Sequence, residues 1–307
     1  MKPEERVITF PIMGRKNSEV IKDFLESLGL KVILPPPITD KTIKLGVKYS
    51  SDMMCFPYKV TLGNFIESLN MGANSILMYS TEGTCRFRQY SYLHNFTLKN
   101  LGYNFEMNVI KSNFLPILRN LSGKSYLKII KNLFYYYKRL KGSQVWSKDK
   151  PNIGIIGEVY CCNDETVNYG LENKIRRFGG NPINTANLVE WVKDNLGIFN
   201  LFGFLKRDEK KIYKKQALKY FNGPLGGHAY ENLYNLMYLI NKGVDGIIHV
   251  LPLSCMPEST IEPYIDHLCN TNNIPLLRIS IDENNSEANL VTRLETFIEL
   301  INWRKRK

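Results

Sequence analysis

The sequence predicts an α/β protein built from two lobes with parallel sheets. Short β-branched runs alternate with segments of helical spacing, which is the pattern of successive βαβ units. This alternation occurs twice, once on each side of a charged stretch with Gly and Pro at residues 141–151. We therefore expect two Rossmann- or flavodoxin-like domains, residues 1–145 and 146–307, which enclose an interdomain cleft.

The first half opens with a short apolar run that predicts a strand, followed by residues at helical spacing that end at Gly29. Pro57 suits the first turn of a helix that is expected to stop at Gly72. Residues 42–51 fit either a strand or a loop. The elements expected in this half are strands at 7–11, 31–34, 75–79 and 104–110, and helices at 18–28, 57–72, 87–101 and 114–140.

The second half repeats this order after the charged stretch. Its most regular strand is the β-branched run at 246–251, which Pro252 ends and which indicates a strand covered on both faces. The other expected strands are at 153–157, 182–184 and 274–282, and the expected helices are at 166–178, within 188–221, within 223–243, from 256 to about 270, and at 288–303.

Composition limits the class of protein. The formal charge is +12, from 41 Lys plus Arg against 29 Asp plus Glu, and such a surplus raises nucleic acid as a partner. The positive residues are spread out, and the clusters at 206–215 and 304–307 are mixed in sign or terminal, so a nucleic-acid partner is not favoured. Because no apolar run is long enough for a membrane span and the start lacks a signal-peptide core, we expect a cytoplasmic protein.

Cysteine is the residue type whose positions suggest a site. Cys85, Cys255 and the pair Cys161 and Cys162 each follow a predicted strand, and Cys55 comes just before a helix. In doubly wound folds such positions share one edge of the sheet. The chain has no CxxC pair, which argues against a zinc ribbon. Thiolates that converge without interleaved histidines indicate an iron–sulfur cluster ahead of zinc.

Packing is the alternative for each cysteine, because cysteine is among the most buried residues. We assign Cys269 to packing, since it lies on the apolar register of a predicted helix. Cys161 and Cys162 are adjacent, so their side chains diverge if the backbone is extended, and at most one of them is expected to be a ligand. A disulfide framework is not expected in a cytosolic chain.

Three glutamates, Glu82, Glu158 and Glu258, lie beside the cysteines. They are candidates for proton donors or for hydrogen-bond partners of the ligands, and equally for helix N-terminal acids that the dipole stabilises. His94 and His267 fall in predicted helices and are expected to be packing residues. The GPLGGH stretch lacks the Lys and Ser/Thr of a phosphate loop, so self-contained ATP hydrolysis is not expected.

Several blocks of sequence resemble a known family. They are FPIMG near the start, CFPYK around Cys55, GTCRFRQY around Cys85, GEVY before Cys161, DGIIHVLPLSCMPE around Cys255 and IDENNSEANLVTRLETFIELI near the end. These blocks resemble the activase-associated proteins related to 2-hydroxyacyl-CoA dehydratase subunits, often called the CoA protein activase family, with double-cubane proteins among their relatives. The resemblance extends over nearly the whole chain.

The resemblance implies two flavodoxin- or Rossmann-like lobes and a 4Fe-4S cluster held by Cys55, Cys85 and Cys255. It also implies a partner activase ATPase with its own iron–sulfur cluster, which delivers low-potential electrons after ATP hydrolysis. Three thiolates leave one iron open to an acyl-CoA or a small reducible substrate, as in a low-potential reductase or a 2-hydroxyacyl-CoA dehydratase component. A dimer is compatible with this reading.

The chain departs from the family pattern at two places. Arg88 stands where Gly is usual after CRF. Cys161 and Cys162 replace what is commonly a pair without cysteine, so one of them is a candidate fourth thiolate, or a ligand of a larger double-cubane-type cluster. A fourth thiolate would favour a non-catalytic electron-transfer or scaffold subunit. The remaining alternative is a two-lobed ligand-binding protein whose cysteines are structural.

Overall fold

The computed structural model describes residues 5–80, 83, 85–111, 114–140, 145–186, 188, 210–220 and 226–306. Its backbone forms two compact units, each with one four-stranded parallel sheet. Within the described residues, the first unit comprises 5–80 and 86–140, and the second comprises 145–186 and 210–306. Cys85 groups with the second unit. The α/β class predicted from the alternation of strands and helices is confirmed.

The first sheet has the strand order β2-β1-β3-β4, and every pairing in it is parallel. Its strands are β1 (Val7–Thr9), β2 (Lys31–Val32), β3 (Ser75–Tyr79) and β4 (Glu106–Ile110). The second sheet repeats this arrangement as β6-β5-β7-β8. Its strands are β5 (Asn152–Gly157), β6 (Asn181–Asn184), β7 (Gly246–Pro252) and β8 (Leu276–Ile281). This is the start of the flavodoxin-like order, in which ligands bind where the order reverses, between the first and third strands.

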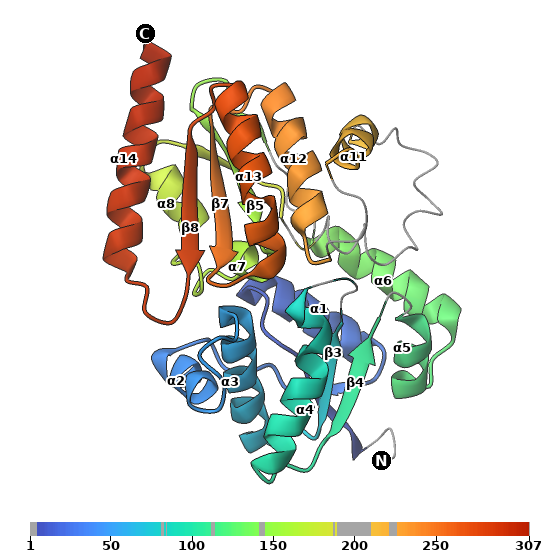
Figure 1. Cartoon of the computed structure of the whole chain (residues 1–307). Helices are drawn as coiled ribbons and strands as arrows, with labels where there is room; N and C mark the ends of the chain where they lie inside the picture. Colours follow the sequence, from blue (N-terminus) through green and yellow to red (C-terminus); the bar gives the residue numbers. More distant parts are fainter. Residues whose placement is uncertain are drawn as a thin grey trace. The chain divides into compact units, whose positions relative to one another are not determined.

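Helices cover both faces of the first sheet (Figure 1). One face carries Ile8 and Leu77, which pack with α1 (Arg15–Ser27), α5 (Leu115–Ser122) and α6 (Tyr126–Leu140). The opposite face carries Ile76 and Met78, which pack with α3 (Phe56–Asn70) and α4 (Tyr90–Asn100). Alternate residues of β3 thus serve opposite cores, as the two-residue period of a strand requires.

The second sheet is covered in the same way. On one face α12 (Ala229–Asn241) and α13 (Met256–Thr271) form a core with Ile247 of β7. On the other face lie α8 (Leu171–Arg177) and α14 (Glu287–Arg306), and the described part also includes α7 (Val159–Asn163) and α11 (Lys211–Ala217). Figure 1 shows the arrowheads of β7 and β8 at the edge of the sheet where α7 lies. That carboxyl edge is the one expected to hold ligands.

Four sequence expectations need correction or refinement. Residues 42–51, left open between strand and loop, mostly belong to the helix α2 (Asp40–Lys48), which begins with a capping box between Thr39 and Thr42. The single helix expected over 114–140 is two helices, α5 and α6, because Gly123 takes a left-handed conformation between them. The helix expected at 166–178 is confined to α8, since Tyr169 and Gly170 have positive φ.

The fourth correction concerns residues 159–163, expected to be a loop, which form the short helix α7. Cys161 and Cys162 are therefore helical rather than extended. Of the helices expected within 188–221, α11 is confirmed, and residues 189–209 lie outside the described part.

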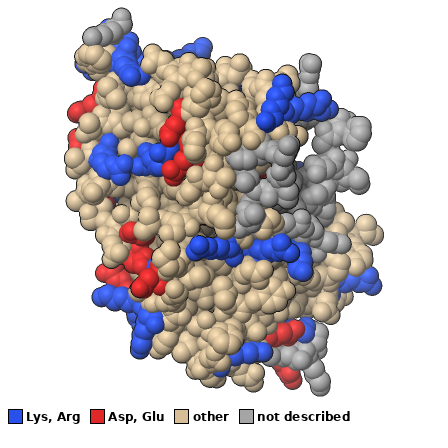
Figure 2. Space-filling model, viewed as in Figure 1, with Lys and Arg blue, Asp and Glu red and all other residues tan. Residues whose placement is uncertain are grey.

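The surface charges are interspersed on the face seen in Figure 2. Lys and Arg side chains alternate there with Asp, Glu and uncharged surface and form no continuous basic patch among the described residues. No helix in the described part of the chain has both the length and the apolar character to cross a membrane.

Candidate functional site

The carboxyl edge of the second sheet brings two cysteine-bearing loops to the point where the strand order reverses. The strand β5 leads into α7, which contains Cys161, and the adjacent strand β7 leads into α13, of which Cys255 is the N-cap residue. Cys161 is fully buried and Cys255 is 7% exposed. The prediction that both follow strands of one sheet edge is confirmed by the parallel pairing of β5 with β7.

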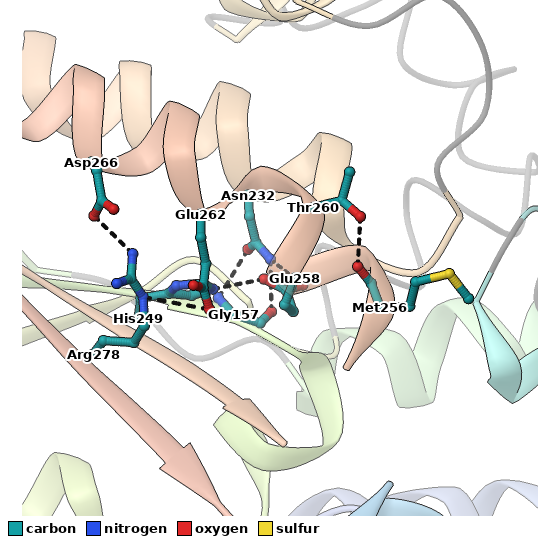
Figure 3. Close-up of polar contacts among 9 residues, drawn as sticks. All are labelled: Gly157, Asn232, His249, Met256, Glu258, Thr260, Glu262, Asp266 and Arg278. Carbon is teal, nitrogen blue, oxygen red and sulfur yellow. Dashed lines mark hydrogen bonds and ion pairs between the residues drawn. The ribbon is translucent and has the colours of Figure 1, made fainter. Parts of the chain in front are cut away.

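A buried hydrogen-bonded group joins these two loops (Figure 3). The Asn232 amide, on α12, accepts a hydrogen bond from Gly157 N at 3.0 Å and donates to Gly157 O at 3.0 Å. The same amide donates to Glu258 Oε1 at 2.8 Å, and the second oxygen of Glu258 lies 2.8 Å from His249 Nε2. All four residues are buried. We call Asn232, Glu258, His249 and Gly157 the Asn232 clamp.

The geometry of Gly157 requires glycine. Its φ is +141°, and a Cβ there would lie 1.8 Å from Val250 O on β7. The backbone of β5 thus approaches β7 more closely than any other residue allows, just before the chain turns into α7. This approach places the start of α7 against the end of β7.

Glu158 caps the helix that carries Cys161. Its two carboxylate oxygens accept hydrogen bonds from Tyr160 N at 3.0 Å and from Cys161 N at 2.9 Å. Burial raises the pKa of the Glu158 carboxyl, against the opposing effect of those two N–H groups. Two carboxyl groups predicted from sequence therefore have defined structural partners, namely Glu158 as a helix cap and Glu258 in the Asn232 clamp. Glu82 lies outside the described residues.

The two adjacent cysteines of α7 have different neighbours. Burial raises the pKa of the Cys161 thiol well above its usual value, and Glu158, Cys162 and Cys255 add to the effect by charge repulsion. Burial likewise raises the pKa of Cys162, but the charges that act on it are Glu158, Glu258 and Glu172. Cys161 is therefore the member of the pair that interacts with Cys255.

Cys85 and the Cys255 turn meet at one glycine. Gly227 has φ +62°, and a Cβ on it would lie 3.2 Å from Pro257 Cγ and 3.6 Å from Cys85 Cβ. The GPLGGH stretch, which does not match a phosphate loop, thus provides a residue without a side chain between Cys85 and the start of α13. This role could not be read from the sequence, because it depends on which segments surround the glycine.

In the first unit, Cys55 is the N-cap residue of α3, and the thiol is half-buried. No acidic residue lies in the first turn of this helix and no side chain caps it. The Cys55 Sγ is hydrogen-bonded to the Tyr90 hydroxyl on α4. Arg86 Nη1 donates to Met53 O at 2.7 Å. The segment immediately after Cys85 therefore holds the turn that carries Cys55.

Two families match separate parts of the chain. Residues 12–81 match the family described as CoA enzyme activase uncharacterised domain, and residues 199–301 match the family described as 2-hydroxyglutaryl-CoA dehydratase, D-component. The predicted resemblance is confirmed. The chain is thus related to a dehydratase component and to an activase-associated domain. A comparison with curated proteins gave no match.

The dehydratase and activase matches each contain one of the predicted ligands. Cys55 lies within the activase-domain match, and Cys255 lies within the dehydratase match together with Glu258. Cys85 and Cys161 fall outside both matched ranges. Asn232 and His249 also lie in the dehydratase match. Their importance was missed at the level of sequence, although Asn232 is a polar residue within an otherwise apolar helical stretch.

The thiols fit an iron–sulfur cluster in chemical type and in setting. Cys55 and Cys255 occupy the same position, the N-cap of a helix whose first turn contains a proline. Free backbone N–H groups and the helix dipole at that position favour an anionic sulfur. All six cysteines are free thiols. The described residues contain no group of three or more His, Cys, Asp and Glu side chains already arranged around a metal position.

The remaining cysteine and the largest cavity lie away from this edge. Cys269 is fully buried in α13, and burial raises the pKa of its thiol to about 12, so its assignment to packing agrees with the structure. A cavity of about 360 Å³ is lined by Cys269, Arg278 and Arg304 near the start of β8. Arg278 is paired there with Asp266 at 2.8 Å. None of the predicted ligands lines this cavity.

Proposed function

We propose that this chain is an iron–sulfur protein of an ATP-dependent reductase or dehydratase system. In this proposal Cys55, Cys85 and Cys255 hold a 4Fe-4S cluster, and a partner activase ATPase with its own cluster supplies low-potential electrons. The observation that carries the proposal is the meeting of Cys85 and the Cys255 turn at Gly227, at the carboxyl edge of the second sheet. The matches to a dehydratase component and an activase-associated domain support it.

The described residues would prepare the site in three ways. The N-termini of α3 and α13 stabilise negative charge on the sulfurs of Cys55 and Cys255. Gly227 leaves the space beside Cys85 unfilled. The Asn232 clamp fixes the end of β5 against the start of α13. When bound, a cluster with three thiolate ligands would supply one-electron chemistry and an iron open to a thioester or another small reducible substrate.

Proton transfer, if the chain is catalytic, belongs to Glu158 ahead of Glu258. Both oxygens of Glu258 already serve the Asn232 clamp, where a change of protonation would break a buried bond. The pKa of Glu158 is raised by burial, which favours the protonated form that a donor needs. The assignment of Glu158 is part of the proposal.

One observation favours a second function, that of an electron-transfer subunit. The repulsion between Cys161 and Cys255 places the Cys161 thiol toward the predicted ligand, whereas Cys162 interacts with other groups. If Cys161 were a fourth thiolate, no iron would remain open and the chain would relay electrons. Cys161→Ser should then lower the iron content or change the EPR signal, and Cys162→Ser, its matched control, should not.

Anaerobic purification with iron and sulfide analysis and EPR spectroscopy tests the main proposal. We expect a brown protein with about four iron atoms per cluster-bearing chain, and Cys55→Ser and Cys255→Ser should lose most of the iron. Cys269→Ser is the control, since this buried thiol lies in the same helix as the Cys255 turn. A colourless, iron-free wild type would sink the proposal and leave the cysteines structural. A reduced-state EPR signal that changes on adding an acyl-CoA would favour catalysis over relay.

A further inference from the structure

Tyr90 is a buried hydroxyl group directed at one of the proposed ligands. Its ring is fully buried on α4, and its hydroxyl is hydrogen-bonded to Cys55 Sγ. The sequence gave no indication of this contact, because Tyr90 is 35 positions from Cys55.

The aromatic residues around Tyr90 hold the ring in one orientation. Its centroid lies 5.0 Å from that of Tyr58 and 5.2 Å from that of Phe87, with interplanar angles of 71° and 53°. His94 lies on a third side at 6.0 Å and is itself fixed by a 3.0 Å hydrogen bond to Thr61 Oγ1. A ring packed in this way cannot turn its hydroxyl away from Cys55 without opening the core.

The direction of the hydrogen bond follows from the chemistry of the two groups. Either atom can donate when Cys55 carries its proton. A sulfur that binds iron has lost its proton, so Tyr90 is then the only possible donor of this pair. A hydrogen bond to a ligand sulfur stabilises the added negative charge of the reduced state.

We infer that the Tyr90 hydroxyl donates a hydrogen bond to the Cys55 sulfur and thereby raises the reduction potential of the bound cluster. This inference rests on the function proposed above. One electron enters from the partner ATPase, and the phenol keeps its proton on oxygen throughout. Tyr90 is a positioning residue that acts through Cys55, and its hydroxyl makes the site easier to reduce.

The test is an EPR-monitored redox titration of the full-length, cluster-bearing protein and its Tyr90→Phe variant. We expect equal iron and sulfide contents and a midpoint potential that is more negative in the variant. Tyr58→Phe is the matched control, because its hydroxyl belongs to the same aromatic group but contacts Thr97 rather than Cys55. That control should keep the wild-type potential.

A second substitution guards against a variant that packs poorly. Placing 3-fluorotyrosine at position 90 keeps the ring and hydroxyl but makes the phenol a stronger donor, so the potential should shift in the positive direction. Cluster-bearing protein whose potential is unchanged in both substitutions would overturn the inference and leave the proposed function standing. A wild type without iron would instead overturn the proposed function, which separates the two failures.

Discussion

At the scale of single residues, buried polar side chains define this protein more than its surface charges do. His94 is fully buried between α3 and α4, stacked 4.3 Å from Tyr58, and bonded to Thr61. Its role as a packing residue was predicted from its place in a helix. The energetic consequence of that role depends on burial, which only the folded chain defines. Burial lowers the pKa of His94 to about 3.

The first prediction is a loss of stability in mild acid. Below pH 6.5 the unfolded chain protonates His94 while the folded chain does not until about pH 3. The unfolded state thus binds more protons in that window, so stability falls as the pH falls, by up to about 1.4 kcal/mol per pH unit. Urea unfolding at several pH values should show His94→Phe with a shallower slope than wild type. His267→Gln, at an exposed position, is the control, and an equal slope in wild type and His94→Phe would contradict the prediction.

At the scale of elements, two close backbone contacts position the helix that carries Cys55. A Cβ on Gly46 of α2 would lie 1.7 Å from Lys59 O on α3, and a Cβ on Gly63 of α3 would lie 2.0 Å from Thr42 O. The two helices therefore touch backbone to backbone. The sequence left residues 42–51 undecided, because the short apolar pattern there is ambiguous and the packing partner that selects the helix is distant in the chain.

The second prediction follows from that contact. Gly63→Ala should push α2 away from α3 and lower the free energy of unfolding by about 3 kcal/mol, the upper end for overpacking a core. The fixed atom in the way is a backbone oxygen, which cannot move like a flexible side chain. Lys44→Ala, at an exposed position of α2, is the control and should change stability little. Chemical denaturation provides the measurement, and a Gly63→Ala variant as stable as wild type would refute the contact.

The third prediction concerns the Asn232 clamp. Asn232→Ala would leave the Gly157 N–H, the Gly157 carbonyl and a Glu258 oxygen with one hydrogen-bond partner fewer in a buried setting. We expect a loss of about 3 kcal/mol, since each unsatisfied buried group costs about 1–3 kcal/mol. Asn235→Ala is the matched control on the same helix, because its side-chain oxygen accepts no hydrogen bond among the described residues.

Thermal or urea unfolding of both variants decides the clamp prediction. If Asn235→Ala costs as much as Asn232→Ala, the loss reflects helix packing rather than the clamp. Because the clamp joins the loops after β5 and β7, Asn232→Ala should also lower iron retention under the proposed function. The sequence identified Glu258 as a candidate, but its partners come from α12 and β7, and no local pattern reveals them.

At the scale of the whole molecule, each unit has its own sheet, with helices on both faces and its own hydrophobic core. The boundary near residues 145 and 146 is a proposal from the sequence. The proposed ligands are divided between the units, with Cys55 in the first and Cys255 in the second. Cys85 is placed by the chain in the first half and groups by contact with the second unit.

The fourth prediction tests the proposed boundary and the division of ligands together. Fragments 1–145 and 146–307, expressed separately, should each give an α/β far-UV circular dichroism spectrum, because each retains a complete four-stranded sheet. Neither fragment alone should retain stoichiometric iron under the proposed function, since each lacks at least one of the three thiols. A single fragment that binds a full cluster would contradict the assignment of ligands, and an unfolded fragment would contradict the boundary.

The sequence by itself determined the α/β class, the repetition of one strand order in two units, and the presence of cysteines after successive strands. These features follow from local periodicity and from the rule that parallel strands end at one edge. Only the tertiary structure decided that α7 is a helix, that Cys161 rather than Cys162 interacts with Cys255, and that Gly227, Asn232 and Tyr90 serve the cysteine-bearing turns. The reason is physical: such contacts join residues far apart in the chain, and burial gives them their energy only once the surrounding elements have packed.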